Sequence, residues 1–305
     1  MKKQKLSLKE IIFRRCRKNG VSVARIKCIS DYLEKIIFEL HPFLDKNFVA
    51  RLVDDQEFEN RMSELYFISA LRNNHLTLFH KSNAGLDIWI NEISGWGEFV
   101  CAHNTEKMER ENVIGKVRSV NNDETLLRIT SILKDKSDKI KEDVKKGRIR
   151  ENESIILFIS TRLLRDPYPM NPEGDVSSFV RALFPLSEPF FTVNVNTKES
   201  RMGRKYQLGI PKNGTVIKND FFLSKENELI SAVVFSYSSI YHDFFYPASS
   251  SKNGDDFIVV HNPLAKNPIP HRLFNCFQEY VCEYEEGVSF TIRDILTKES
   301  DPQID

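Results

Sequence analysis

The amino-acid sequence predicts an α/β protein with a central mixed sheet flanked by helices and a helical pair at the N-terminus. Apolar residues recur at helical spacing over residues 22–40 and again over 123–146. The segment 154–160 (SIILFIS) contains a continuous apolar run, as a strand buried on both faces of a sheet does. Helices that alternate with such strands are typical of a layered α/β fold.

The composition of the 305 residues is that of a globular protein with a large core. Apolar residues make up 41% and charged residues 29%, and the 22 phenylalanines supply much apolar area for burial. The formal net charge is only +1, so binding to nucleic acid or to an anionic surface requires a local basic patch.

The cysteines predict a reducing compartment. Five cysteines, odd in number and without a CxxC pair, indicate neither a disulfide framework nor a zinc knuckle. The basic N-terminus is not followed by an apolar segment of the signal-peptide type, and no run approaches the ~18 apolar residues that a membrane span needs. We therefore expect a cytoplasmic protein that does not enter a membrane.

The first elements are two helices. Ser7 and Glu10 have the spacing of a capping box, in which each side chain accepts a hydrogen bond from the other residue's backbone N–H. A second helix is predicted over 22–40, and Pro42 ends it. We assign residues 1–47 to an N-terminal helical segment and residues 48–305 to the α/β domain, which together form one compact unit with an appendage.

The N-terminal helices are strongly basic. Residues 1–30 carry ten Lys or Arg and one acidic residue. These cations, with Arg14, Arg15 and Arg17 among them, form either a phosphate-binding surface or the solvated face of two amphipathic helices.

The remaining elements follow from periodicity and turn residues. We predict helices over 54–73 and 123–146, ended by Asn73-Asn74 and Gly147. The segments 191–195 and 206–210 are expected to pair at a sheet edge, and 245–256 is expected to be a mobile loop. The predicted strands are 75–80, 86–90, 98–103, 154–160, 230–235 and 257–261.

Several motifs together resemble the PD-(D/E)XK nuclease superfamily, in a branch of uncharacterised bacterial proteins. They are Glu64-Leu65-Tyr66 on a helix, Asp87 within Gly-Leu-Asp-Ile, the strand 99–102 (FVCA), and a following helix with Arg128 and Lys136. The later strands of the sequence also resemble those of this group, so the resemblance covers about residues 55–275. It implies a restriction-endonuclease-like core.

The resemblance implies Mg²⁺-dependent chemistry on phosphodiesters. Asp87 and a glutamate on the next strand would hold the ion, and Glu64 would complete the acidic cluster, because Mg²⁺ prefers carboxylate oxygens. The expected glutamate is replaced by Cys101 and the expected lysine by His103. Cys101 and His103 are too few ligands for zinc, and Glu98 faces away from Cys101 in a regular strand.

Each site residue also has a structural interpretation. Glu64 can pair with Arg61 on its own helix, and Cys101 can be a small buried apolar residue. Asp87 is harder to explain in this way, because aspartate is depleted in strands.

We therefore predict a degenerate nuclease-like protein that binds nucleic acid or a protein partner without efficient hydrolysis, with no cofactor or only weakly bound Mg²⁺. An active Mg²⁺-dependent nuclease and a protein–protein interaction module are the alternatives. The candidate catalytic residues are Glu64, Asp87, Cys101 and His103, with Asp87 and Glu64 as metal ligands. The candidate nucleic-acid contacts are Arg14, Arg15, Arg17, Arg128, Lys134 and Lys136.

Overall fold

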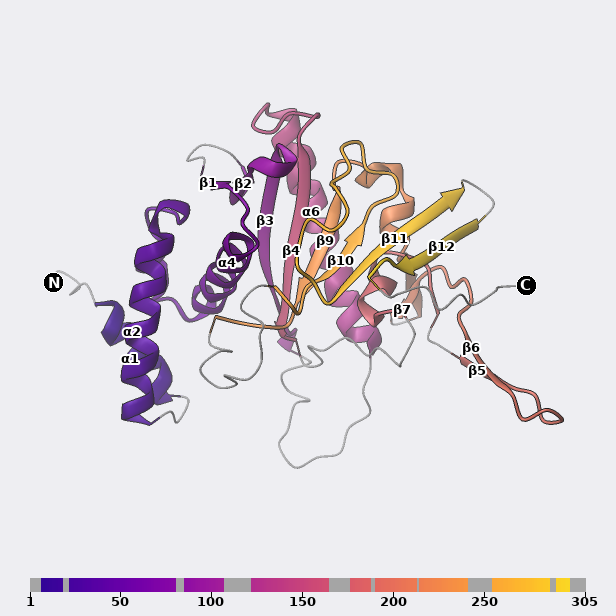
Figure 1. Ribbon diagram of the computed structural model, residues 1–305, viewed down its shortest axis with the longest axis horizontal. Helices are drawn as coiled ribbons and strands as arrows, with labels where there is room; N and C mark the ends of the chain where they lie inside the picture. Colours follow the sequence, from indigo (N-terminus) through magenta and orange to yellow (C-terminus); the bar gives the residue numbers. More distant parts are fainter. Residues whose placement is uncertain are drawn as a thin grey trace.

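The computed structural model is built around one eight-stranded mixed sheet in the order β1-β2-β3-β4-β9-β10-β11-β12 (Figure 1). The predicted α/β class is confirmed. The structure describes residues 7–18, 22–80, 85–106, 122–164, 176–187, 190–212, 214–240, 254–285 and 289–296. The strands of the sheet are β1 (Leu78–Phe79), β2 (Ile88–Ile90), β3 (Gly95–His103), β4 (Ser154–Leu163), β9 (Ala232–Ser236), β10 (Ile258–His261), β11 (Gln278–Glu285) and β12 (Ser289–Asp294).

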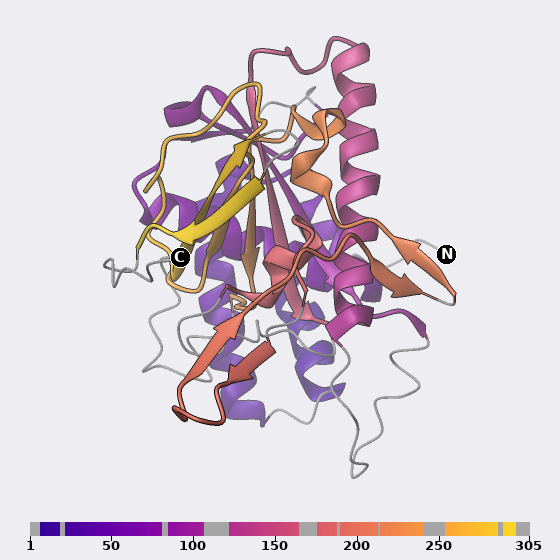
Figure 2. The same cartoon turned by 90° about the vertical axis from the view of Figure 1, so that its right-hand side faces the viewer.

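Helices cover both faces of this sheet (Figures 1 and 2). Ile156 and Phe158 of β4 share a core with the N-terminal helices and α4, and we call this side the α4 face. Ile155, Leu157 and Ile159 share a second core with α6, which defines the α6 face. The helices are α1 (Leu8–Lys18), α2 (Val23–Leu40), α3 (Phe48–Arg51), α4 (Asp55–Asn73) and α6 (Asn122–Lys145).

The predicted N-terminal helices are confirmed, as is the capping box. The backbone N–H of Ser7 donates to Glu10 Oε2 over 2.7 Å, and the N–H of Glu10 donates to Ser7 Oγ over 3.3 Å. Ile11 and Ile12 of α1 belong to the same core as α4 and the sheet. In the part of the chain that the structure describes, no helix has the length and apolar character needed to cross a bilayer.

The segment from α4 to β4 positions the candidate site. Strands β1, β2 and β3 form an antiparallel meander, and α6 then carries the chain to β4, which pairs parallel to β3. In the β2–β3 hairpin Ile88 lies opposite Gly97. Continued by one residue, this register places Asp87 opposite Glu98 on the neighbouring strand.

The predicted sheet edge is wrong. The segment near 191–195 forms β5 (Phe190–Val193), which pairs with β6 (Ser200–Gly203) in a separate hairpin. Ile210 belongs to a second small hairpin, β7 (Ile210–Lys212) with β8 (Thr215–Ile217). The sheet continues instead through β11 and β12, and the glutamates of β11 (QEYVCEYE) hide its strand pattern. Most of the predicted loop 245–256 lies outside the described residues.

Candidate functional site at the β2–β3 hairpin

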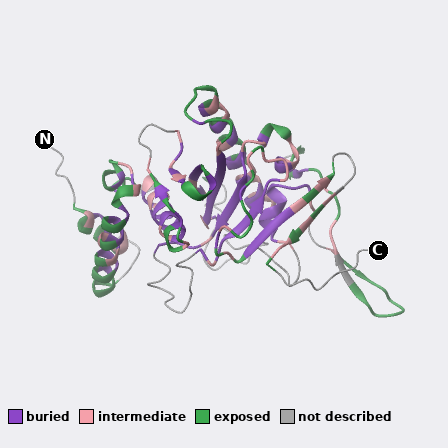
Figure 3. Ribbon diagram, turned by 45° about the horizontal axis from the view of Figure 1, so that its top comes forward, coloured by how far each residue is buried: buried purple, intermediate pink, exposed green. Residues whose placement is uncertain are grey.

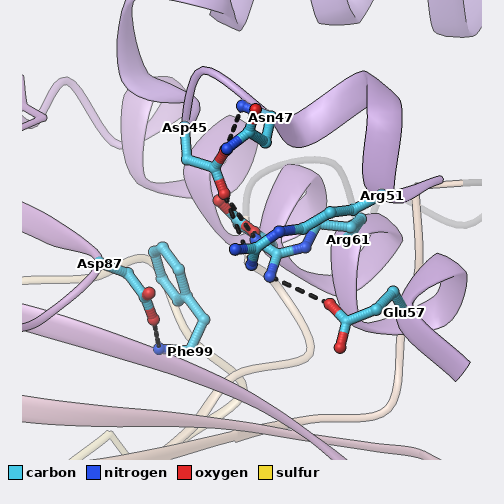
Figure 4. A network of polar contacts seen from close by, with 8 residues as sticks. Asp45, Asn47, Arg51, Glu57, Arg61, Asp87 and Phe99 are labelled. Atoms are coloured by element: carbon cyan, nitrogen blue, oxygen red, sulfur yellow. Dashed lines mark hydrogen bonds and ion pairs between the residues drawn. The ribbon is translucent and has the colours of Figure 1, made fainter.

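Glu64 lies on α4 and contacts Arg61, whose other partners Glu57 and Asp45 are seen in Figure 4. Arg61 Nη1 donates to Glu64 Oε2 over 2.5 Å, and Arg61 also contacts Glu57 at 3.2 Å and Asp45 at 3.7 Å. Burial raises the pKa of Glu64 to about 8, Arg61 acts in the opposite direction, and the charges of Asp87 and Asp45 add to the rise. The contact between Arg61 and Glu64 on the helix, which is the structural interpretation of Glu64, is therefore present.

Asp87 precedes β2 and caps the open end of the hairpin. Its Oδ2 accepts a hydrogen bond from the backbone N–H of Phe99 over 2.6 Å (Figure 4). Burial raises the pKa of Asp87 to about 7, and the charge of Glu98 adds to this rise. The Phe99 N–H, Lys139 and Lys136 oppose it. Asp87 interacts electrostatically with Glu64, but the two carboxylates have different hydrogen-bond partners.

Glu98 is the carboxylate that the fold places opposite Asp87. It is 2% exposed, and its Oε1 accepts hydrogen bonds from Lys136 Nζ at 2.6 Å and Lys139 Nζ at 2.7 Å. Its Oε2 is buried and has no hydrogen-bond partner among the described residues. Burial tends to lower the pKa of Lys139, yet the charges of Glu98, Asp87 and Asp143 raise it above its ordinary value.

Cys101 lies on the other face of the sheet. Phe99 and Phe158 are paired across β3 and β4 and pack in the α4-face core, and Cys101 pairs with Ser160 two residues further along. Because side chains alternate along a strand, Cys101 shares the α4 face with Phe99, whereas Glu98 faces α6. Burial raises the pKa of the Cys101 thiol. The expected opposition of Glu98 and Cys101 is confirmed, and Cys101 is a buried core residue.

His103 and Arg128 act at the end of β3. His103 Nε2 lies 2.9 Å from Asn60 Oδ1 of α4, and Arg128 Nε donates to the His103 carbonyl oxygen over 2.8 Å. A register irregularity separates Cys101 from His103. These contacts join α4, β3 and α6, so they give both side chains a structural role.

The remaining predicted nucleic-acid contacts fall into two groups. Lys134, Arg14 and Arg17 are exposed. Arg15 is half-buried and its guanidinium lies 4.8 Å from the centre of the Phe58 ring. Lys136 donates a hydrogen bond to Glu98. The exposed cations are therefore the ones available to phosphates.

No group of three or more His, Cys, Asp or Glu side chains that could hold a metal ion occurs among the residues that the structure describes. Among these residues the predicted ligands Asp87 and Glu64 thus lack a third side chain that would complete a metal site with them.

Two buried acidic residues were missed by the sequence analysis. Asp143 of α6 accepts a hydrogen bond from Arg148 Nη1 over 2.8 Å, and it packs so tightly on Gly85 that a Cβ at this glycine would lie 2.2 Å from Oδ2. Asp256 accepts hydrogen bonds from Tyr66 Oη and from Ser236 Oγ. Gly85 within the Gly-Leu-Asp motif was a signal for the close packing of Asp143, whereas no local pattern marks Asp256.

Comparisons of this chain with protein-family models, with curated proteins and with solved structures find no match. The geometry of the β2–β3 hairpin and the surfaces around it are therefore the basis for a functional assignment.

Proposed function

We propose that this protein is a PD-(D/E)XK nuclease-like protein that binds nucleic acid without efficient phosphodiester hydrolysis. The order of elements supports this: helix α4, the antiparallel strands β1 to β3, the Arg- and Lys-bearing helix α6 and then β4. The resemblance implies this order of motifs. Asp87, directly before the second strand, and Glu98, on the third, supply a pair of carboxylates. Glu98 lies three residues before the position at which the motif places its glutamate.

The observation that carries the loss of hydrolysis is the double lysine contact of Glu98. Both ammonium groups bind Oε1, and the carboxylate is 2% exposed. Mg²⁺ gives up its water reluctantly and needs accessible, negatively charged oxygens. Two lysines beside Asp87 and Glu98 neutralise the pair, so they compete with a divalent ion for the same oxygens.

A second candidate is an active Mg²⁺-dependent hydrolase. It is favoured by the opposition of Asp87 and Glu98 across the hairpin with lysines beside them, because a carboxylate pair and a cation are the groups that such a reaction uses. In that case Lys139, whose side chain is 44% exposed, would leave Glu98 when an ion binds.

One set of measurements separates these functions. The native protein and the Asp87→Ala variant are incubated with single- and double-stranded DNA and RNA in Mg²⁺ and Mn²⁺, and binding is followed by fluorescence anisotropy at two salt concentrations. We expect binding that weakens steeply with salt, because phosphate contacts release counterions, and no cleavage. Cleavage that Asp87→Ala abolishes would establish the hydrolase, and absence of binding would favour the protein–protein module.

The N-terminal basic surface can be tested in the same assay. Arg14 and Arg17 are exposed, so the double change Arg14→Ala and Arg17→Ala should weaken binding to all sequences alike. Arg15 is left intact because its guanidinium packs on Phe58. Unchanged binding would reject this surface and leave the proposed function standing.

We also propose the cytoplasm as the working compartment. All five cysteines are free thiols in the structure, which suits a reducing environment.

A further inference from the structure

The hairpin of β5 and β6 stands away from the body of the molecule (Figures 1 and 3). Its two strands pair only with each other, and residues 191–200 are all exposed. A lone two-stranded ribbon is marginally stable in water and adds nothing to the core. Such an element has to be held in place by its ends, and its exposed surface is free to contact a partner.

The base of this hairpin is fixed to the body. Arg204 donates to the Ser187 carbonyl over 2.6 Å and to the Val176 carbonyl over 3.0 Å. The backbone N–H of Ser187 donates to the Lys205 carbonyl, and Leu186 forms a bridge with Tyr206. The ribbon therefore leaves the body in a defined direction.

The tip is equally well formed. The backbone N–H of Asn194 donates to the Glu199 carbonyl over 2.9 Å, and that of Lys198 donates to the Asn194 carbonyl over 2.8 Å. The Asn194 side chain accepts hydrogen bonds from the N–H groups of Asn196 and Thr197. This turn places Lys198, which has a positive φ of 61°, at the far end of the ribbon.

The surface of the ribbon combines positive charge with exposed apolar groups. Residues 190–206, which we call the arm, contain four Lys or Arg and one acidic residue, in a chain whose net charge is only +1. Lys205 Nζ lies 5.2 Å from the centre of the Phe190 ring. The exposed apolar side chains of the arm are Phe191 (66%), Val193 (59%), Val195 (85%) and Tyr206 (65%).

We propose that the arm is a nucleic-acid contact, in which Lys198 and Lys205 bind phosphates while Phe191 and Tyr206 pack against bases. This inference rests on the proposed function and names a surface for it. A two-stranded ribbon fits a DNA groove, and aromatic side chains among cations are typical of surfaces on which bases stack. A polyanion complements the arm's charge, which is why we assign nucleic acid here.

The neighbouring hairpin of β7 and β8 extends the positive charge along the chain. Lys212 and Lys218 are exposed, and the segment 206–218 contains no acidic residue. The two small hairpins point in different directions in Figure 2, so the test concerns the arm alone.

The test uses the full chain with three double variants. Lys198→Ala with Lys205→Ala removes two of the arm's four cations, and Phe191→Ser with Tyr206→Ser removes its two exposed aromatic side chains. Lys35→Ala with Lys46→Ala is the matched control, because both lysines are exposed on the N-terminal helical segment and lie outside the arm. Affinity for single- and double-stranded DNA and RNA is measured against salt, and thermal unfolding confirms that each variant is folded.

We expect the charge variant to bind about tenfold more weakly. The slope of log affinity against log salt concentration should become shallower by about 1 for each phosphate that the arm no longer binds. The aromatic variant should weaken binding to single strands without changing the slope, and the control should match the native protein. If the native protein binds nucleic acid and both arm variants bind it as tightly as the native protein does, the arm proposal is overturned and the proposed function stands.

Two other outcomes also decide against the arm as a nucleic-acid contact. If the native protein binds no nucleic acid, the proposed function fails and the arm proposal fails with it. If vesicles of anionic phospholipid bind the native protein and release the arm variants, while nucleic-acid binding is unchanged, the arm contacts a lipid surface instead.

Discussion

The charged clusters around Glu64 and Glu98 combine cations and carboxylates in different proportions. On the α4 face Arg61 contacts three carboxylates, those of Asp45, Glu57 and Glu64, and Arg51 also contacts Asp45. On the α6 face two cations, Lys136 and Lys139, contact one carboxylate, that of Glu98. Buried charges are tolerated only when they are paired, and these are two different solutions.

This difference shows why the expected acidic cluster is divided. Glu64 belongs to the carboxylate-rich α4 face, Glu98 belongs to the lysine-rich α6 face, and Asp87 lies between them at the end of the hairpin. The charge that would attract a divalent ion is therefore compensated separately on each side of the sheet. Substitutions on the two faces should have effects that differ in size and in pH dependence.

The largest effect is expected for Cys101→Glu on the α4 face. Cys101 is 6% exposed, so the new carboxylate would be buried without an assigned cation and should destabilise the protein by about 4 kcal/mol. Chemical denaturation measures this loss, and calorimetric titration with Mn²⁺ should show no gain in binding. Cys101→Ala, which adds no charge, is the control and should lose about 1 kcal/mol. A stable Cys101→Glu variant that binds Mn²⁺ would show that position 101 belongs to the candidate metal site.

The next effect compares the two lysines of the α6 face. Their side chains are 23% exposed for Lys136 and 44% for Lys139, although both bind the same Glu98 oxygen. Lys136→Met should lose about 2 kcal/mol, and Lys139→Met about 1 kcal/mol, because a more solvated partner contributes less. Urea denaturation at neutral pH measures both. Equal losses would show that exposure does not separate their contributions.

Asp87→Asn should change how stability depends on pH. A pKa raised by burial to about 7 means that the folded state holds a proton that the unfolded state releases near pH 4. The contribution of protonated Asp87 to stability is complete below pH 4 and is lost as the pH rises through about 7. Over this window the Asp87→Asn variant should therefore gain stability relative to the native protein. A difference that stays constant from pH 4 to pH 8 would contradict the buried, protonated Asp87.

Glu64→Gln should have the smallest effect. Burial and the 2.5 Å contact with Arg61 act on this carboxyl in opposite directions, and Arg61 keeps Glu57 and Asp45 as partners in the variant. We expect a loss or gain of less than about 1 kcal/mol at neutral pH. Because the pKa of Glu64 is raised to about 8, its contribution is present at low pH and declines as the pH rises through 8. Thermal unfolding at pH 5 and pH 9 measures this trend, and a loss of several kcal/mol would show that the ion pair dominates.

Much of the fold was predictable from local patterns. The helical spacing of Ile26, Ile29 and Leu33 matches α2, and the apolar run from Ser154 matches β4. The strand β11 was not predictable in this way, because its sequence QEYVCEYE alternates glutamate with apolar residues at the end of the sheet. The arm was misassigned to the sheet because its exposed Phe191 and Val193 have strand propensity without any core to cover.

The candidate site shows where local patterns stop being sufficient. Asp87 stood out as an aspartate next to a strand, and the alternation along β3 correctly separated Glu98 from Cys101. That Glu98 meets Lys136 and Lys139, or that Asp256 meets Tyr66 far along the chain, depends on the crossover through α6 and on the packing of α4. Periodicity is a property of neighbouring residues, whereas the pairing of buried charges depends on which elements the chain brings together, and that information is spread over the whole sheet.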